Sequence, residues 1–341
     1  MLWGLCACAA PELAPYRETR AAMGTTFSIT VYASDGVRAE DALEAAFARV
    51  MELDGLLSDH DPTSELSRLS ERPAGRPTPV SPDLWTALVG AAEVNELSAG
   101  AFDVTVGPLS RLWRRARRRA EHPRAEHLSR ARAAVGARHL MLDPVHRTVT
   151  LALDGMRIDL GAIAKGYALD QVLRVLKRRG IVHALVEGGG DLAAGEPPPQ
   201  RAGWRVAVEV LSDVDAPRVQ LSLARAALAT SGDLYQHTLI DGVRSSHIID
   251  PRTGLGLTRR VGATVVAGSG LRADALASAL CVLGPERGLA LVETLEGVDA
   301  RLMTLEDGEL QAHESSGFRL MMVPSPRPTQ DGRGPRGAGI D

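Results

Sequence analysis

The chain has 341 residues, of which 45% are hydrophobic and 24% charged, and these are the proportions of an ordinary globular protein with a large core. Its net charge of -3 argues against nucleic acid as the main partner. No apolar run reaches the length of about 18 residues that a membrane-spanning helix needs.

The N-terminus begins with the apolar, small-residue stretch MLWGLCACAAPELAP. Its letters LCAC end at Cys8 and resemble the cleavage box of bacterial lipoproteins, in which the cysteine carries the lipid, although the charged opening of an export signal is missing. We therefore expect residues 1–18 to be a truncated lipoprotein signal and flexible terminus, with a lipid anchor at Cys8. A frayed terminus without signal function is the alternative.

Regular structure is predicted first at TTFSITVYA, residues 25–33, because apolar and polar residues alternate there as in a strand. Residues 39–58 have helical spacing of their apolar side chains. A second helix is predicted over residues 81–100, with Ser81 as its N-cap and Gly100 as its stop.

The middle of the chain contains a dense arginine segment, residues 111–139, with ten arginines but only two glutamates. Because charge runs on helices are usually exposed, we interpret it as the solvated face of surface helices. Residues 139–161 are typical of two or three strands around a turn at Pro144. A helix is predicted over residues 162–179, with a stripe of apolar side chains: Leu169, Val172, Leu173 and Leu176.

The C-terminal half continues with further elements: strands in 181–191, 203–210, 218–230 and 261–268, a helix over 270–283 and another from Pro285. The tail, residues 323–341, is rich in Pro, Gly and Arg and is expected to be disordered. Strands and long helices without strict alternation predict an α+β fold. A local βαβ crossover around the helix at 162–179 stays open.

The stretch DLGAIAKGY, residues 159–167, places small residues and a lysine at the start of a helix. A helix N-terminus offers unpaired N–H donors and partial positive charge, so a phosphate-bearing ligand could approach, with Lys165 adding a full charge. Asp159 either contacts the ligand or caps the helix.

Three further segments contain candidate groups. VEGGGDL, residues 186–192, permits a tight hairpin turn or the close approach of a ligand. His247 lies in a polar neighbourhood and could act as a base near neutral pH, although a lone histidine is more often structural. Asp274 and Ser278 are four residues apart on a predicted helix, so their hard oxygens share a face that suits Mg²⁺; exposed helix surface is the alternative.

The order of these segments and their residues resemble those of the FAD:protein FMN transferases, the ApbE family. The resemblance spans roughly Met23 to Phe318 and includes MGTTFSI, SDHDPTSELSRLS, GAFDVTVGPL, DLGAIAKGYALD, VEGGGDL, ATSGDLYQ, SHIIDPRTG and ADALASAL. It implies an α+β fold of two subdomains over residues 19–322, with mixed, largely antiparallel sheets, flanking helices and an FAD cleft between the subdomains.

The resemblance also implies an activity. Such an enzyme cleaves the pyrophosphate of its substrate FAD with Mg²⁺ as cofactor, attaches FMN through a phosphoester to a threonine of a flavin-accepting redox protein, and releases AMP. The alternatives are an FAD pyrophosphatase and a flavin-binding lipoprotein without turnover. The resemblance and the LCAC box together predict a periplasmic protein, lipid-anchored to the inner membrane.

Site residues follow where this sequence matches the family pattern. The pattern implies that FAD contacts Met23, Ala101, Phe102, Asp103, Asp159, Lys165 and Ile248. It implies Mg²⁺ ligands from Asp274, the hydroxyl of Ser278 and the backbone carbonyl of Ala162, and His247 as the base for the incoming threonine. The sequence departs from the pattern at His60 (usually Tyr), Ser278 (usually Thr) and Ser70 (often Asn).

Overall fold

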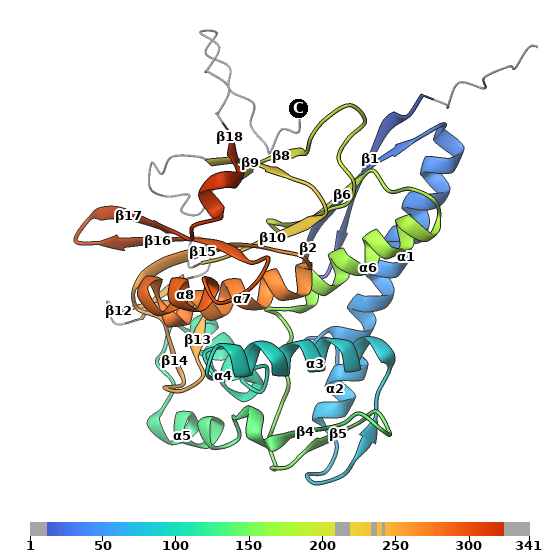
Figure 1. Cartoon of the computed structure of the whole chain (residues 1–341). Coiled ribbons are helices and arrows are strands. Elements are labelled where there is room, and N and C mark those ends of the chain that lie inside the picture. The colour runs from blue at the N-terminus through green and yellow to red at the C-terminus, as the bar shows by residue number, and fades with distance from the viewer. Residues whose placement is uncertain (1–11, 209–218, 233–236, 241–242, 324–341) are drawn as a thin grey trace, which may run out of the picture.

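The computed structural model describes residues 12–208, 219–232, 237–240 and 243–323, which form an α+β structure (Figure 1). An eight-stranded sheet with the order β1-β2-β6-β7-β10-β15-β16-β17 occupies the upper part of the view, and each neighbouring pair is antiparallel. Its strands are β1 (Ala14–Ala22), β2 (Thr25–Ala33), β6 (Ala184–Gly188), β7 (Asp191–Ala194), β10 (Ala226–Gly232), β15 (Arg260–Ala267), β16 (Asp299–Glu306) and β17 (Glu309–Glu314).

The two faces of this sheet are covered differently, because successive residues of a strand point to opposite sides. Ala184 and Val186 of β6 join the core under the helices, whereas Leu185 between them packs with Trp204 and Leu221 on the other face. The helical layer consists of α1 (Gly36–Leu57), α6 (Ala164–Arg178), α7 (Gly270–Leu283) and α8 (Pro285–Val292). The opposite face is covered by a small sheet of β18 (Met322–Val323), β9 (Val219–Leu223) and β8 (Trp204–Val208).

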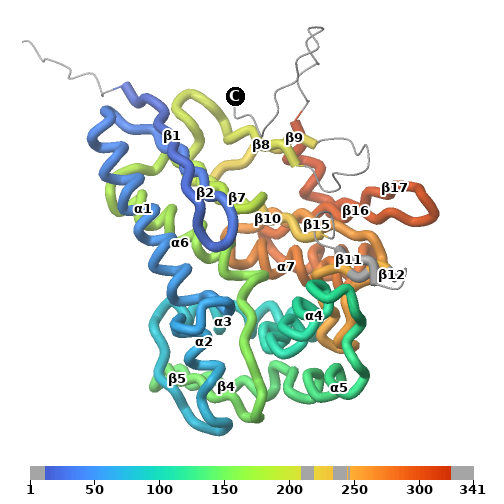
Figure 2. The backbone as a smooth tube through the Cα atoms, turned by 180° about the vertical axis from the view of Figure 1, so that it is seen from behind, coloured from blue at the N-terminus to red at the C-terminus, as the bar shows by residue number. Residues whose placement is uncertain are grey.

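The lower part of the molecule is mostly helical, and α1 runs into it along one side (Figure 2). It contains α2 (Glu65–Ser70), α3 (Pro82–Leu97), α4 (Gly107–Arg119), α5 (Ala125–Ala133) and a sheet of β3 (Thr78–Pro79), β5 (Thr148–Leu151) and β4 (Leu140–Asp143). Two short hairpins, β11 (His237–Ile240) with β12 (Val243–Ser246) and β13 (Ile249–Asp250) with β14 (Leu255–Gly256), lie near α4 (Figures 1 and 2).

Local sequence signals explain several element boundaries. Ser81 caps α3 by accepting a hydrogen bond from the Leu84 N–H at 3.2 Å, as expected for a serine N-cap. Gly189 and Gly190 have φ angles of 62° and 96°, so they form the tight turn that pairs Gly188 with Asp191. These two glycines therefore form the hairpin turn after which Asp191 begins β7.

The small residues at the start of α6 let two helices approach closely. A Cβ on Gly166 would lie 2.0 Å from the carbonyl oxygen of Gly270, which begins α7. Asp170 of α6 accepts hydrogen bonds from the Gly270 N–H at 2.6 Å and the Leu271 N–H at 3.0 Å. The first turns of α6 and α7 are thus held together, and this contact positions Lys165 beside Asp274.

The predicted α+β class with largely antiparallel sheets is confirmed. Two strands, not three, form around Pro144, and β5 and β6 belong to different sheets, so no βαβ crossover encloses α6. Residues 14–18, expected to be part of a flexible terminus, pair with β2 as the start of β1. Cys8 and residues 324–341 lie outside the described residues. Within the described chain, no helix combines the length and apolar character needed to cross a bilayer.

Candidate active site

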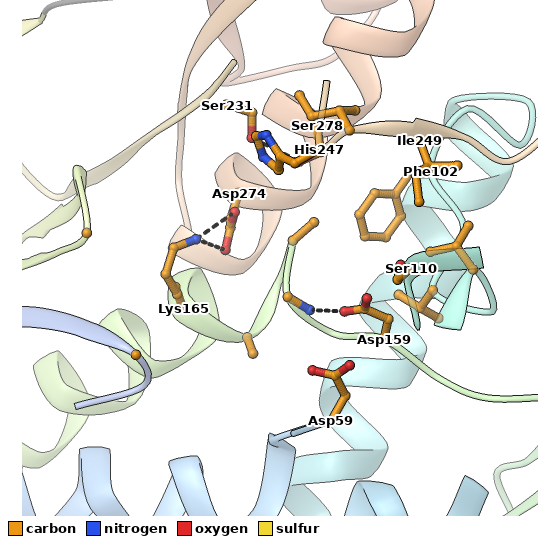
Figure 3. A pocket seen from close by; sticks show the side chains of 18 of the residues that line it. Asp59, Phe102, Ser110, Asp159, Lys165, Ser231, His247, Ile249, Asp274 and Ser278 are labelled. Atoms are coloured by element: carbon orange, nitrogen blue, oxygen red, sulfur yellow. Dashed lines mark hydrogen bonds and ion pairs between the residues drawn. The ribbon is translucent and has the colours of Figure 1, made fainter. Parts of the chain in front are cut away.

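A cavity of about 770 Å³ lies where turns of the eight-stranded sheet meet α4 and the loop after α1 (Figure 3). Its volume falls within the range of about 300–1,000 Å³ that is typical of small-molecule sites. All the residues assigned above to substrate, metal or catalysis line it: Met23, Ala101, Phe102, Asp103, Asp159, Ala162, Lys165, His247, Ile248, Asp274 and Ser278. The fold therefore brings residues that are up to 255 positions apart in the chain to one site.

Lys165 lies between two buried carboxylates at one side of this cavity. Its Nζ is 2.9 Å from Asp191 Oδ2 and 3.4 Å from Asp274 Oδ2, and both acidic side chains are at most 3% exposed. Asp274 Oδ2 also accepts a hydrogen bond from the Gly166 N–H at 3.0 Å, and Asp191 Oδ1 accepts one from the Thr230 N–H at 3.0 Å. Two carboxylates and one ammonium group give this cluster one excess negative charge.

The pKa values of the cluster reflect burial and charge. Burial, together with the nearby Asp274, raises the pKa of Asp191 to about 6, against the attraction of Lys165. Burial disfavours the charged form of Lys165, but Asp274 and Asp191 outweigh that effect and raise its pKa. Lys165 is therefore a permanent cation at neutral pH.

The oxygen atoms beside Lys165 fit a magnesium ion. Asp274 Oδ1 has a hydrogen-bond contact only to Lys165, at 3.5 Å, and Ser278 Oγ lies 2.9 Å from Ser231 Oγ among the described residues. No group of three His, Cys, Asp or Glu side chains that could hold a metal occurs in the described part of the chain. Hard oxygens of this kind are ligands that Mg²⁺ accepts together with waters and substrate phosphate oxygens.

His247 reaches the cavity from the segment between β12 and β13. The segment is anchored because the Ser246 N–H donates to the Leu257 carbonyl at 2.8 Å and the Leu257 N–H donates to the Ile248 carbonyl at 2.9 Å. Figure 3 shows the imidazole on the side of the cavity where Ser278 and Ser231 project. The half-buried ring is thus held by a fixed backbone next to the oxygen donors.

The two acidic residues on the other side of the cavity differ in what they can offer a ligand. Asp103 uses both carboxylate oxygens within the protein, accepting from Thr105 N–H at 2.8 Å and from Ala137 N–H at 2.9 Å. Asp159 accepts from the Gly161 N–H at 2.9 Å rather than from α6, whose first residue is Ala164. The helix-capping alternative for Asp159 is therefore wrong.

Comparison with known proteins identifies the family. The model of the ApbE family matches residues 23–302. This chain belongs to the ApbE family. A curated FAD:protein FMN transferase of Vibrio cholerae is 35% identical over 87% of this chain and 90% of the relative, and one of Salmonella typhimurium is 31% identical over 89% and 85%.

Solved structures of ApbE proteins share the fold. The flavin transferase ApbE from Vibrio cholerae superposes with a TM-score of 0.81 and 32% identity, covering 91% of this chain and 99% of that one. The apo form of the Pseudomonas stutzeri flavinyl transferase ApbE gives 0.82 and 32%, covering 92% and 98%. These similarities confirm the resemblance that the motifs indicated.

Several polar residues of this ApbE cavity were missed by sequence reasoning. Asp191 ends the glycine turn, and the letters GGGD were the available signal. Ser231 and the α4 residues Arg114 and Arg117 also line the cavity, although the arginine segment was interpreted as solvated surface. That interpretation holds for part of α4 only.

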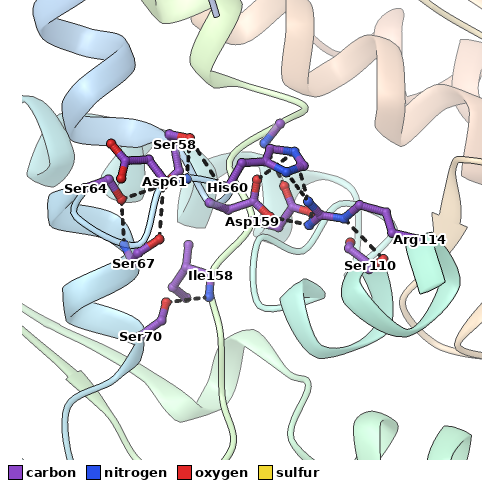
Figure 4. A network of polar contacts seen from close by, with 12 residues as sticks. Ser58, His60, Asp61, Ser64, Ser67, Ser70, Ser110, Arg114, Ile158 and Asp159 are labelled. Atoms are coloured by element: carbon purple, nitrogen blue, oxygen red, sulfur yellow. Dashed lines mark hydrogen bonds and ion pairs between the residues drawn. The ribbon is translucent and has the colours of Figure 1, made fainter. Parts of the chain in front are cut away.

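Arg114 belongs to a network that joins α4 to the loop after α1 (Figure 4). Its guanidinium pairs with Asp59, lies 3.4 Å from Asp159 Oδ2 and contacts the His60 ring at 2.9 Å. Ser70 Oγ accepts a hydrogen bond from the Ile158 N–H at 3.2 Å, just before Asp159. Both departures from the family pattern therefore lie close to Asp159. His60 contacts Arg114, which lies beside the Asp159 carboxylate, and Ser70 contacts the backbone of the residue before Asp159.

Proposed function

We propose that this protein transfers the FMN moiety of FAD to a threonine hydroxyl of a flavin-accepting redox protein, releasing AMP, with Mg²⁺ as cofactor. The main support is that four residues line one cavity in a chain whose relatives are named FAD:protein FMN transferases: Lys165, Asp274, Ser278 and His247. The cluster has the excess negative charge and hard oxygens that a divalent cation prefers.

Charge neutralisation is the first requirement of the reaction, because a pyrophosphate repels an attacking oxygen. Asp274, the Ser278 hydroxyl and the Ala162 carbonyl would hold Mg²⁺, which when bound supplies several kcal/mol of charge stabilisation on the phosphate oxygens. Lys165 contributes a cation of its own, and Asp191 together with Asp274 fixes its ammonium group at this place.

Proton transfer is the second requirement. The threonine oxygen forms a bond to the phosphorus of the FMN half, and the bond from that phosphorus to the bridging oxygen breaks, so AMP leaves with the bridging oxygen. His247 accepts the proton of the threonine hydroxyl, a role that typically contributes about 10²–10⁴-fold in rate.

The apolar wall of the cavity would receive a ring of FAD. Phe102 and Ile248 are both buried, and both line the cavity. Asp159 has one oxygen directed toward Arg114 and the other bonded to Gly161, so its remaining acceptor capacity is available to a ligand.

One incubation tests this function. The protein is mixed with FAD, Mg²⁺ and a domain that is an established FMN acceptor of another family member, and the products are analysed by mass spectrometry. Covalent FMN on the domain supports the proposal. Free FMN with AMP instead identifies a pyrophosphatase, and bound FAD without turnover identifies a flavin carrier.

We further propose that the protein is periplasmic and lipid-anchored at Cys8. The support is the LCAC box. Mass spectrometry of the protein purified from membranes of its own host tests this, since a diacylglyceryl group on Cys8 supports the anchor and an unmodified Cys8 contradicts it.

A further inference from the structure

Helix α4 presents three faces, which follow from its periodicity of 3.6 residues per turn. Leu109, Trp113 and Ala116 are buried in the core. Ser110, Arg114 and Arg117 share the next face and line the cavity. The third face carries the exposed residues Arg111, Arg115, Arg118 and Arg119, which we call the outer face of α4.

The outer face is a concentrated positive surface on a protein whose net charge is negative. Arg115, Arg118 and Arg119 are exposed and form no ion pair or side-chain hydrogen bond among the described residues. A helix C-terminus attracts cations, which accounts in part for Arg118 and Arg119 in the last turn. It does not account for Arg115, which lies a turn earlier.

Arg117 connects this surface to the cavity. Its Nη1 is buried and has no hydrogen-bond partner in the described structure, although the residue lines the cavity. Burial lowers the pKa of Arg117, and the neighbouring Arg114 lowers it further. Keeping this charged side chain buried therefore costs folding free energy. By contrast, Arg114 on the same face is compensated by Asp59 and Asp159.

We propose that the outer face of α4, together with Arg117, is the docking surface for an acidic segment of the acceptor protein. This inference rests on the proposed function, because that function requires a second protein to present its threonine at the cavity. Carboxylates of the segment pair with the outer arginines, and the innermost carboxylate reaches Arg117.

The position of the surface favours a protein partner over a lipid bilayer. The outer and cavity faces of α4 are adjacent, since Arg114 and Arg118 are one helical turn apart. Any partner on the outer arginines therefore also lies next to the cavity, which is where the reaction needs the acceptor. Opposite charges across such a surface accelerate encounter and fix orientation.

The test compares two triple variants with equal changes in charge. The first combines Arg115→Glu, Arg118→Glu and Arg119→Glu. The matched control combines Arg72→Glu, Arg76→Glu and Arg287→Glu, which are exposed, lie outside the cavity lining and make no described side-chain contact. FAD affinity, measured by quenching of flavin fluorescence, is expected to stay unchanged in both.

Binding is measured by fluorescence anisotropy with two synthetic peptides, one with a threonine among glutamates and one with glutamines in place of the glutamates. The wild-type protein should bind the glutamate peptide about tenfold more tightly, an advantage that salt removes. The outer-face variant should lose this preference, and the control should keep it.

Three outcomes would overturn the inference: equal binding of both peptides by the wild type, an equal loss in the control, or unchanged peptide preference in the outer-face variant. Phosphatidylserine vesicles are added in a separate arm. If the outer-face variant loses vesicle binding while keeping its peptide preference, the surface serves a membrane instead. A failure of the proposed function gives a different result: the wild-type protein keeps its preference for the glutamate peptide, but no covalent FMN forms on the acceptor domain.

Discussion

On one side of the cavity, Lys165 lies between two carboxylates that are almost fully buried. On the side lined by α4, by contrast, Arg117 has a buried nitrogen that finds no hydrogen-bond partner among the described residues. The first cluster has an excess negative charge before any ligand binds. On the second side, Arg114 is paired with Asp59 and Asp159, whereas Arg117 forms no ion pair among the described residues. The cavity therefore favours a cation beside Asp191 and Asp274 at one side and an anion beside Arg117 at the other.

The largest effect is expected at Asp274, the only carboxylate among the three proposed metal ligands. Asp274→Asn should lower FMN transfer by more than about 10³-fold, because several kcal/mol of charge stabilisation depend on the metal. Transfer rates at saturating FAD and increasing Mg²⁺ measure this, and chelation of Mg²⁺ from the wild type is the matched comparison. Near-normal transfer in the variant would remove Asp274 from the metal site.

The contrast between the two buried cations is tested directly by the effects of Lys165→Met and Arg117→Met on stability. The first leaves two buried carboxylates without their cation and should lower the free energy of unfolding by about 3 kcal/mol in metal-free protein. The second removes a cation that has no carboxylate partner in the described part of the chain, and it should change stability by less than about 0.5 kcal/mol or raise it. Urea denaturation at neutral pH measures both, and equal losses would contradict the contrast.

His247→Gln should slow FMN transfer by about 10²–10³-fold, since the metal, Lys165 and the bound geometry stay in place. FAD affinity should be unchanged. Single-turnover transfer rates measure the loss, and a loss greater than that of Asp274→Asn would reverse the proposed order of the two contributions.

Gly166→Ala should separate α6 from α7, because the added Cβ would collide with the Gly270 carbonyl. We expect a loss of about 1–3 kcal/mol in the free energy of unfolding and a weaker contact between Lys165 and Asp274. Gly55→Ala in α1 is the control: apart from its chain neighbours and the backbone of its own helix, no atom of the described residues lies within 4 Å of its added Cβ, so this change should stabilise by about 0.5–1 kcal/mol. Thermal unfolding of both variants distinguishes crowding from a general intolerance of alanine.

The last prediction concerns the pH dependence of stability. The folded pKa of Asp191, about 6, lies above its unfolded value of 3.8, so the folded state binds more protons between these values and loses stability as pH rises through them. Asp191→Asn should reduce that loss by an amount on the order of 3 kcal/mol in metal-free protein. Urea midpoints measured across this pH range test it; identical slopes in both proteins would show that Asp191 titrates normally.

Much of the local structure could be predicted because it depends on neighbouring residues. Strand β2 and helix α7 were predicted with the boundaries that the structure has, from alternation in one case and helical spacing in the other. Ser81 and the Gly189-Gly190 turn act through backbone hydrogen bonds and φ angles only a few residues away. The residues of the candidate site were predicted differently, from the resemblance of short sequence motifs to those of the ApbE family.

How these motif residues are arranged relative to one another could be seen only in the tertiary structure. Lys165 and Asp191 belong to different elements, and only the order of the sheet and the close contact of α6 with α7 bring both to Asp274. An arginine-rich helix looks uniformly solvated in sequence, yet packing of Trp113 into the core turns Arg114 and Arg117 toward the cavity and leaves Arg115 outside. Sequence determined which side chains exist and their local conformations; the long-range packing decided which charges face one another, because that depends on contacts between residues far apart in the chain.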